Sequence, residues 1–188
     1  DLLLFTSGAP PNKNNNFGGG LYKLEINNFK WNYKKILNGN CYGLLKLDNK
    51  FFVVDEERGI VKLNKNLKIE KIYKIEKNLR PHGLSFHKKT NKFFLNSTEQ
   101  DAVYIYDKNF KFLNTISISD KKKITDVKHH HINDNLILDD NLYLSMFSYS
   151  GNYLREVYDG VLLQYNLNNL HEDPKVLINN LWMPHNIK

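Results

Sequence analysis

Short runs of apolar, aromatic and β-branched residues recur along the whole chain, and each is separated from the next by polar residues. Residues 51–54 (Phe-Phe-Val-Val) and 93–96 (Phe-Phe-Leu-Asn) are typical. Asn, Asp, Lys and Gly gather between the runs, as they do in the turns between strands. No stretch shows the sustained periodicity of an amphipathic helix. The pattern therefore predicts an all-β protein.

One of these runs is repeated four times, at residues 20–24, 59–63, 102–106 and 160–164. Each copy begins with Gly or Ala, continues in strand-forming residues and reaches a turn that bears Asn or Asp. The first two intervals are close to the ~40–50 residues of a four-stranded propeller blade. Insertions around residues 119–130 and 148–158 lengthen the third. The repeat predicts a β-propeller built of four-stranded antiparallel blades.

Further predicted strands flank each copy. The strands before the copies are 2–5, 51–54, 93–96 and 142–145, those after them are 33–37, 69–73, 112–116 and 174–178, and the first strands of blades are 42–47, 82–86, 132–138 and a start at His185. The blade units then cover approximately residues 1–38, 39–78, 79–118 and 126–179, with the next blade starting at 181–188. Together they form a single propeller domain or a fragment of one.

The order of the strands leaves two architectures open, because the chain begins on a second strand and ends on a first strand. The favoured one is a piece of a six- or seven-bladed propeller, whose remaining blades belong to the same chain. The alternative is a closed four-bladed propeller in which the last strand completes the first blade. An unclosed piece would leave edge strands exposed.

Composition narrows the class of protein. Hydrophobic residues make up 41% of the 188 residues and aromatic residues 13%, which is typical of a folded domain with a sizeable core. No apolar run is long enough to span a membrane. No signal peptide is visible, so a cytoplasmic location is slightly favoured, and secretion stays open if such a peptide has been lost. Cys41 is the only cysteine, which excludes an intrachain disulfide.

The net charge of +7 raises the question of an anionic partner. The basic residues are scattered along the chain and are mostly lysines, whereas a nucleic-acid site concentrates them on one face. We therefore expect lysines on solvated strands and turns, and no specific nucleic-acid partner.

Histidines mark the predicted site. In a propeller the first strand of each blade lines the central channel, and its starting end lies on the face that carries the loops between second and third strands. His82 and His185 each follow a proline at the start of a first strand, and His131 directly precedes residues 132–138. Alignment of the blades puts Tyr42 and Asn133 in the position of His82. We expect these side chains to meet at the channel mouth.

Two kinds of chemistry suit such a group of imidazoles. Three histidines that leave one coordination position open are typical of catalytic zinc, so His82, His131 and His185 are the candidate ligands of a divalent metal, zinc or calcium. Without a metal, the same histidines are candidate catalytic proton carriers near neutral pH. The competing interpretation is structural, with each histidine hydrogen-bonded to the neighbouring blade.

Polar residues on the same face are the candidate substrate contacts. Arg80 and Arg155 would meet anionic groups of a substrate, and Tyr42 and Asn133 would line the pocket. The candidates also include Asn186 and, in the long loop 148–158, Asn152. A loop of that length on a rigid scaffold is more often functional than idle.

The blade pattern resembles that of the NHL-repeat, gluconolactonase and virginiamycin B lyase propellers. Pro81-His82-Gly83-Leu84 with the following residues 91–97 and 102–107 is similar to an NHL-type blade. Residues 130–134, 143–148, 151–152, 158–160 and 182–185 are more similar to an uncharacterised bacterial propeller family of unknown function. The resemblance covers nearly the whole chain and implies a fold more than an activity.

Within this class the site chemistry differs between families. The peptidylamidoglycolate lyase propeller is similar in that histidines from several inner strands hold zinc. The gluconolactonase pattern uses carboxylates and amides, which Asn133 and Asn186 match in part, whereas no matching Glu is identified.

The sequence thus predicts a propeller that binds a small molecule or a carbohydrate, either as a binding protein or as a metal-assisted lyase or hydrolase. The alternative is a non-catalytic scaffold that holds a protein or a polysaccharide on the same face.

Overall fold

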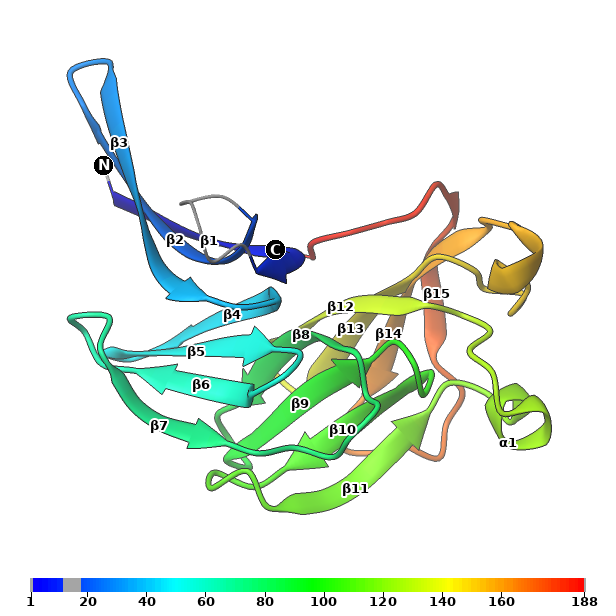
Figure 1. The fold of residues 1–188 in the computed structure, drawn as a ribbon. Helices are drawn as coiled ribbons and strands as arrows, with labels where there is room; N and C mark the ends of the chain where they lie inside the picture. Colours follow the sequence, from blue (N-terminus) through cyan, green and yellow to red (C-terminus); the bar gives the residue numbers. More distant parts are fainter. Residues whose placement is uncertain (1, 12–17, 188) are drawn as a thin grey trace. The chain divides into compact units, whose positions relative to one another are not determined.

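A computed structural model describes residues 2–11 and 18–187 of the chain. Strands are the main secondary structure of the described part, as predicted, and its antiparallel sheets are the blades of a β-propeller fold (Figure 1). The chain divides into two compact units, residues 1–75 and 76–188, and each is described here by itself. Neither of the two short helices in the described ranges is long or apolar enough to cross a membrane.

Unit 1 contains two antiparallel sheets whose strands follow one another in chain order. The first comprises β1 (Leu2–Pro11), β2 (Gly18–Asn27) and β3 (Lys30–Asn38), and the second comprises β4 (Cys41–Leu47), β5 (Lys50–Asp55), β6 (Gly59–Leu63) and β7 (Ile69–Tyr73). Leu21 from β2 packs with Val53 and Val61 from the second sheet, and all three are fully buried. This core consists of the apolar runs that identify the strands in the sequence.

Unit 2 contains two four-stranded sheets. The first comprises β8 (Pro81–His87), β9 (Lys92–Ser97), β10 (Ala102–Tyr106) and β11 (Phe112–Ser117), and the second comprises β12 (Ile132–Leu138), β13 (Asn141–Met146), β14 (Gly160–Asn166) and β15 (Lys175–Leu181). The first strands β8 and β12 lie side by side. Between the sheets Val103 packs against Leu144 and Val161, all fully buried.

The two insertions of unit 2 carry its only described helical turns, α1 (Lys121–Thr125) and η1 (Tyr153–Arg155). Residues 182–187, where the sequence predicts the start of a further first strand, have no strand pairing. The main-chain N–H of Ile187 donates to the Asp134 carboxylate, 3.0 Å away, and not to a neighbouring strand. The Asp134 side chain thus takes the place of a main-chain acceptor for this N–H group.

The predicted alignment of the blades is confirmed by strand register. Each first strand has an irregularity between its first pair and the pair three residues later, at Cys41/Leu44, Pro81/Leu84 and Ile132/Asn135. Residues 42, 82 and 133 therefore occupy equivalent positions, each one residue after the first pair. A bulge changes the direction of the side chains next to it. The irregularity therefore sets the direction of the side chain at this position in each first strand.

Tight turns join first to second strands in three of the sheets. Asp48 and Asp139 are the first residues of two-residue turns, and Asn91 is the last residue of a four-residue turn. Their φ angles are 51°, 51° and 54°. Asn and Asp tolerate this left-handed backbone better than other side chains except glycine. The polar residues that separate the apolar runs in the sequence are thus required by the turn geometry.

Candidate functional site

The three predicted histidines of unit 2 gather around the ring of Phe147, directly after β13. The ring of His131 is stacked on Phe147, with centroids 4.3 Å apart and planes 9° from parallel. The ring of His185 packs on Phe147 at 4.8 Å, and the ring of His82 meets His131 edge-on at 6.0 Å. We call His82, His131, His185 and Phe147 the histidine cluster. His82 lies at the start of β8, His131 directly before β12, His185 after β15 and Phe147 directly after β13.

Asn133 determines the tautomer of His82. The side-chain amide of Asn133 donates from Nδ2 to the main-chain oxygen of Pro184 at 3.4 Å, so its Oδ1 faces Nδ1 of His82 at 3.0 Å. Because this oxygen only accepts, the hydrogen of the neutral ring lies on Nδ1 and the lone pair on Nε2. Burial lowers the pKa of His82, although the Asn133 contact opposes the shift. The structure therefore holds a neutral, oriented imidazole that can accept a proton.

His131 sits in a more restricted environment. Its Nδ1 is buried and has no hydrogen-bond partner among the described atoms. Burial first, and then the charges of His82, Lys128 and Arg80, lower the pKa of His131 to about 3. The residue also has a left-handed backbone, with φ at 53°. A neutral ring in a strained position is more often a functional feature than an accident.

A buried carboxylate holds the start of β12 in this conformation. Asp101, which is 1% exposed, accepts hydrogen bonds from the main-chain N–H groups of His129, His130 and His131. Three donors pointing at one carboxylate form an anion-binding turn of the kind called a nest. Asp101 lies at the start of β10, so the neighbouring blade positions the histidine of this blade.

The outer residues of the cluster are more accessible. Arg80 and Asn186 are exposed, and both have left-handed backbones, with φ at 46° and 53°. Arg80 lies close enough for its charge to contribute to the lowered pKa of His82 and of His131. Nδ1 of His185, an exposed side chain, contacts the main-chain oxygen of Met183 at 2.9 Å. The predicted contacts Arg80, Asn133 and Asn186 thus belong to one region with the histidines.

Aromatic rings extend the cluster toward the surface. Tyr153 of η1 packs on His131 at 4.5 Å and on Tyr158 at 6.1 Å, and Tyr158 meets the edge of Trp182 at 5.0 Å. Trp182 is 75% exposed, so its ring is available to a ligand. Rings with a polar edge suit the faces of sugars and other flat molecules.

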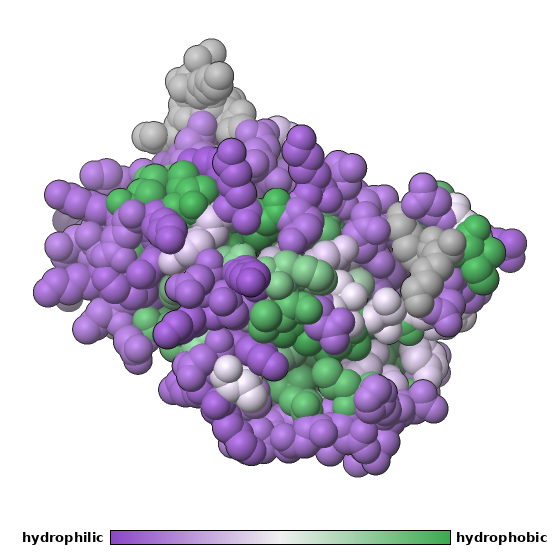
Figure 2. Space-filling view, turned by 90° about the horizontal axis from the view of Figure 1, so that it is seen from below, coloured by the Kyte–Doolittle hydropathy of each residue, from purple (hydrophilic) through white to green (hydrophobic). Residues whose placement is uncertain are grey.

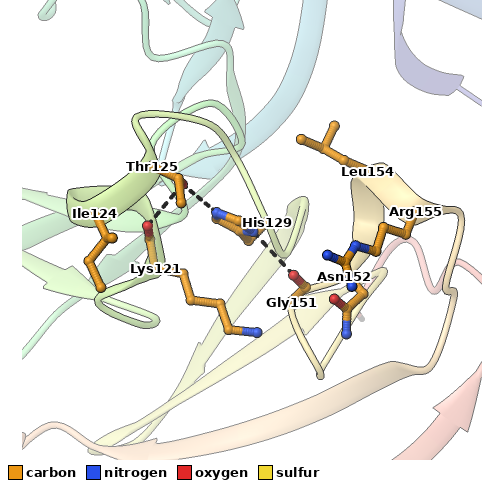
Figure 3. A pocket seen from close by; sticks show the side chains of 8 residues that line it. All are labelled: Lys121, Ile124, Thr125, His129, Gly151, Asn152, Leu154 and Arg155. Carbon is orange, nitrogen blue, oxygen red and sulfur yellow. Dashed lines mark hydrogen bonds between the residues drawn. The ribbon is translucent and has the colours of Figure 1, made fainter.

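The other two predicted contacts lie elsewhere in unit 2. Asn152 and Arg155 line a pocket of about 360 Å³ between α1 and the loop that carries η1 (Figure 3). The histidine that lines this pocket is His129, and none of the cluster histidines is among its lining residues. The loop 148–158 therefore contributes residues to two sites. Tyr153 contacts the histidine cluster, whereas Leu154 and Arg155 line the pocket.

Tyr42 is part of unit 1 and is described with that unit. Its ring lies against Gly8, where a Cβ would come within 2.3 Å of the ring. Its main-chain oxygen accepts a hydrogen bond from the hydroxyl of Thr6. The equivalence of Tyr42 with His82 is confirmed by the register, and its contact with substrate stays a prediction.

The side chains do not form a ready metal site. Within residues 2–11 and 18–187, no group of three or more His, Cys, Asp or Glu side chains is arranged to hold a metal ion. In the cluster, Nδ1 of His82 and Nδ1 of His185 already have oxygen partners. The metal predicted at His82, His131 and His185 stays a prediction.

Sequence reasoning missed Phe147 of the histidine cluster and Asp101, which holds the main chain of His131. Phe147 ends the second strand of its blade at the level of the histidines, a position that the repeat alignment could have identified. Asp101 directly precedes a repeated run, yet nothing in the sequence indicates that its carboxylate points at the next blade.

The chain is similar to solved propeller structures. No protein-family model matches it, and no curated protein matches its sequence. Similar structures are the periplasmic gluconolactonase of Pseudomonas aeruginosa (TM-score 0.60, 8% identity, 95% of this chain and 53% of that one), a chain of a nidogen–laminin complex (0.59, 13%, 97% and 63%) and the glutaminyl cyclase of Myxococcus xanthus (0.54, 11%, 86% and 66%). The chain spans between about half and two thirds of their lengths. Identities this low show the fold alone.

Proposed function

We propose that the histidine cluster binds a small polar molecule, such as a sugar or a sugar lactone, and that His82 acts as a general base in its hydrolysis. The observation that carries the proposal is the orientation of His82 by Asn133, which leaves the lone pair on Nε2. The fold that the chain shares with a gluconolactonase is consistent with this class of substrate.

The chemistry requires few groups. Nε2 of His82 would take a proton from water as the water oxygen bonds to the lactone carbonyl carbon. The ring C–O bond then breaks, and the proton passes from His82 to the leaving oxygen. Arg80, which lies nearby and is exposed, would favour the negative charge that develops on the carbonyl oxygen. The exposed ring of Trp182 would stack on the substrate.

The decisive variant is His82→Gln, tested on lactone hydrolysis with a panel of sugar lactones. Gln keeps a polar side chain near Asn133 but cannot accept the proton, so we expect kcat to fall about a hundredfold while binding persists. His171→Gln, at an exposed histidine in the turn before β15, is the matched control and should leave the rate unchanged. If lactones bind and His82→Gln hydrolyses them at the unaltered rate, the base assignment is wrong.

The metal-assisted form of this activity has its own test. His82, His131 and His185 would be the ligands, and the bound zinc or calcium would supply a Lewis acid. Elemental analysis of the purified protein should then find one metal ion per chain, and His82→Gln should lose it. A metal-free protein with full activity would contradict this form and leave proton transfer by His82.

A specific observation favours a second function, that of a binding scaffold. Trp182, Tyr149 and Leu154 of unit 2 are 75%, 48% and 56% exposed, so each leaves apolar surface that a partner could cover. One of the similar structures comes from a complex of two proteins, nidogen and laminin. A scaffold would bind a protein or polysaccharide partner with loss of affinity in Trp182→Ala and no effect of His82→Gln, the reverse of the catalytic expectation.

A further inference from the structure

The pocket between α1 and the loop that carries η1 is distinct from the histidine cluster. We propose that it binds an amphiphilic monoanion, a carboxylate with a short hydrocarbon body, and that Arg155 and Lys121 hold the carboxylate. The proposal does not depend on the activity of the histidine cluster, because the two sites share no lining histidine.

The charge of the pocket points to an anion. Its lining residues, as far as the structure describes them, include Lys121 and Arg155 and no Asp or Glu. Arg155 is exposed. Its guanidinium and the ammonium of Lys121 both extend toward the space between α1 and Asn152 (Figure 3). The planar fork of an arginine matches the two oxygens of a carboxylate.

The walls of the pocket are largely apolar. Ile124 and Leu154 stand on opposite sides, and they are 81% and 56% exposed. Figure 2 shows hydrophilic residues over most of the face in view and apolar residues gathered toward its middle. Each apolar side chain that a ligand covers contributes favourable free energy. The hydrocarbon part of a ligand bound between Ile124 and Leu154 would remove both side chains from water, whereas inorganic phosphate has no apolar part to do so.

The pocket is also held open by specific contacts. His129 connects its two sides, with Nδ1 at 3.2 Å from the main-chain oxygen of Gly151 and Nε2 at 2.6 Å from the hydroxyl of Thr125. The ammonium of Lys121 donates to the main-chain oxygen of Ser150, which joins the same two sides. The remaining N–H groups of this ammonium can still donate to a ligand. A volume of about 360 Å³ lies in the range of small-molecule sites.

Calorimetric titration of the full chain with octanoate tests the proposal. We expect saturable binding, and an affinity at least about tenfold lower for Arg155→Gln, since one charge-assisted contact is lost. Leu154→Asp should abolish binding, because it places a negative charge against the ligand. Both residues are exposed, so the variants should melt like the parent protein. Lys108→Gln, which removes one charge from an exposed turn, is the matched control and should bind octanoate normally.

Two further ligands distinguish the contributions of the head and the body. Inorganic phosphate and octanol should each bind far more weakly than octanoate. If octanol binds as tightly as octanoate, the pocket is apolar and does not recognise the anionic group. If phosphate binds as tightly as octanoate, the pocket recognises charge and does not use the hydrocarbon body. Either result, or octanoate binding that Arg155→Gln leaves unchanged, would overturn the proposal. None of these outcomes bears on lactone hydrolysis at His82.

Discussion

Three consecutive histidines in one segment have three different environments. His129 lines the pocket beside α1, and His131 belongs to the histidine cluster. His130 is buried between them, with Nδ1 at 2.9 Å from the oxygen of Ser148 and Nε2 at 2.8 Å from the hydroxyl of Ser119. Both of its ring nitrogens are therefore engaged within the protein. The shared anchor of the three histidines is Asp101, which receives all three main-chain N–H groups.

The stability of the protein should depend on the neutral state of His131. In the folded chain its pKa is lowered from 6.5 to about 3, so below pH 6.5 the unfolded chain binds a proton that the folded chain refuses. The contribution of neutral His131 to the free energy of unfolding is therefore fully retained above pH 6.5 and is lost as the pH falls toward 3. We expect the free energy of unfolding, measured by urea denaturation, to fall across this window.

The variant His131→Asn should flatten that pH dependence. Asn does not titrate, and it tolerates the left-handed backbone of this position. His171→Asn is the matched control, because His171 is exposed. An equally steep loss of stability in His131→Asn would show that other groups cause it.

At the scale of elements, the blades repeat their turns as well as their strands. After β6 the side chain of Asn64 accepts the main-chain N–H groups of residues 66 and 68, and after β10 Asp107 accepts those of residues 109 and 111. The fourth residue of each turn, Leu67 or Phe110, has φ at 60°. These are Asx turns, in which the side-chain oxygen accepts hydrogen bonds from main-chain N–H groups two or more residues further along the chain. This is the physical cause of the Asn- and Asp-bearing turns that follow the second and third repeated runs.

The hairpin of β2 and β3 departs from the common turn chemistry. Its two-residue turn consists of Asn28 and Phe29, with φ at 47° and 64°, the pattern of a type I′ turn. Phe29 is fully exposed and gains no packing from this strained backbone. Phe29→Gly should therefore stabilise the protein by about 1 kcal/mol, measured as a rise in the midpoint of thermal unfolding.

The control for this hairpin is Phe29→Ala. Ala removes the exposed ring but keeps the Cβ, so the backbone strain remains and no comparable gain is expected. An equal gain from both variants would attribute the effect to the ring and not to the left-handed backbone.

At the scale of the molecule, the positive charge is dispersed. Many lysines lie beside acidic residues, as in the pairs of Lys50 and Lys62 with Glu70 and of Lys89 with Asp140. Exposed pairs of this kind contribute little to stability. The expectation of no specific nucleic-acid partner stays a prediction.

Fluorescence anisotropy with labelled duplex DNA tests this expectation. We expect weak binding at low salt from the net charge of +7, the same for unrelated sequences and lost by about 0.2 M salt. Binding that persists at that salt, or that prefers one sequence, would contradict a merely dispersed charge.

The sequence by itself determined the blades. Its apolar runs, its small residues before each third strand and its Asx turns are local features, because a strand and a tight turn depend on residues close in the chain. The repeated runs coincide with β6 and β10 and with the start of β14, and the alignment of Tyr42, His82 and Asn133 holds in the register. Repetition made even this longer-range inference possible.

Only the tertiary structure decided which side chains meet. Asp101 holds residues about thirty positions further along the chain, and Asn133 orients His82 of another blade. The same folding places Arg155 in the pocket beside α1 and not in the histidine cluster, although both lie on loops of the predicted face. Such contacts depend on the direction of single side chains across neighbouring sheets, which neither periodicity nor spacing encodes. The blades can therefore be predicted from the sequence, whereas the histidine cluster and the pocket depend on how the sheets and loops pack.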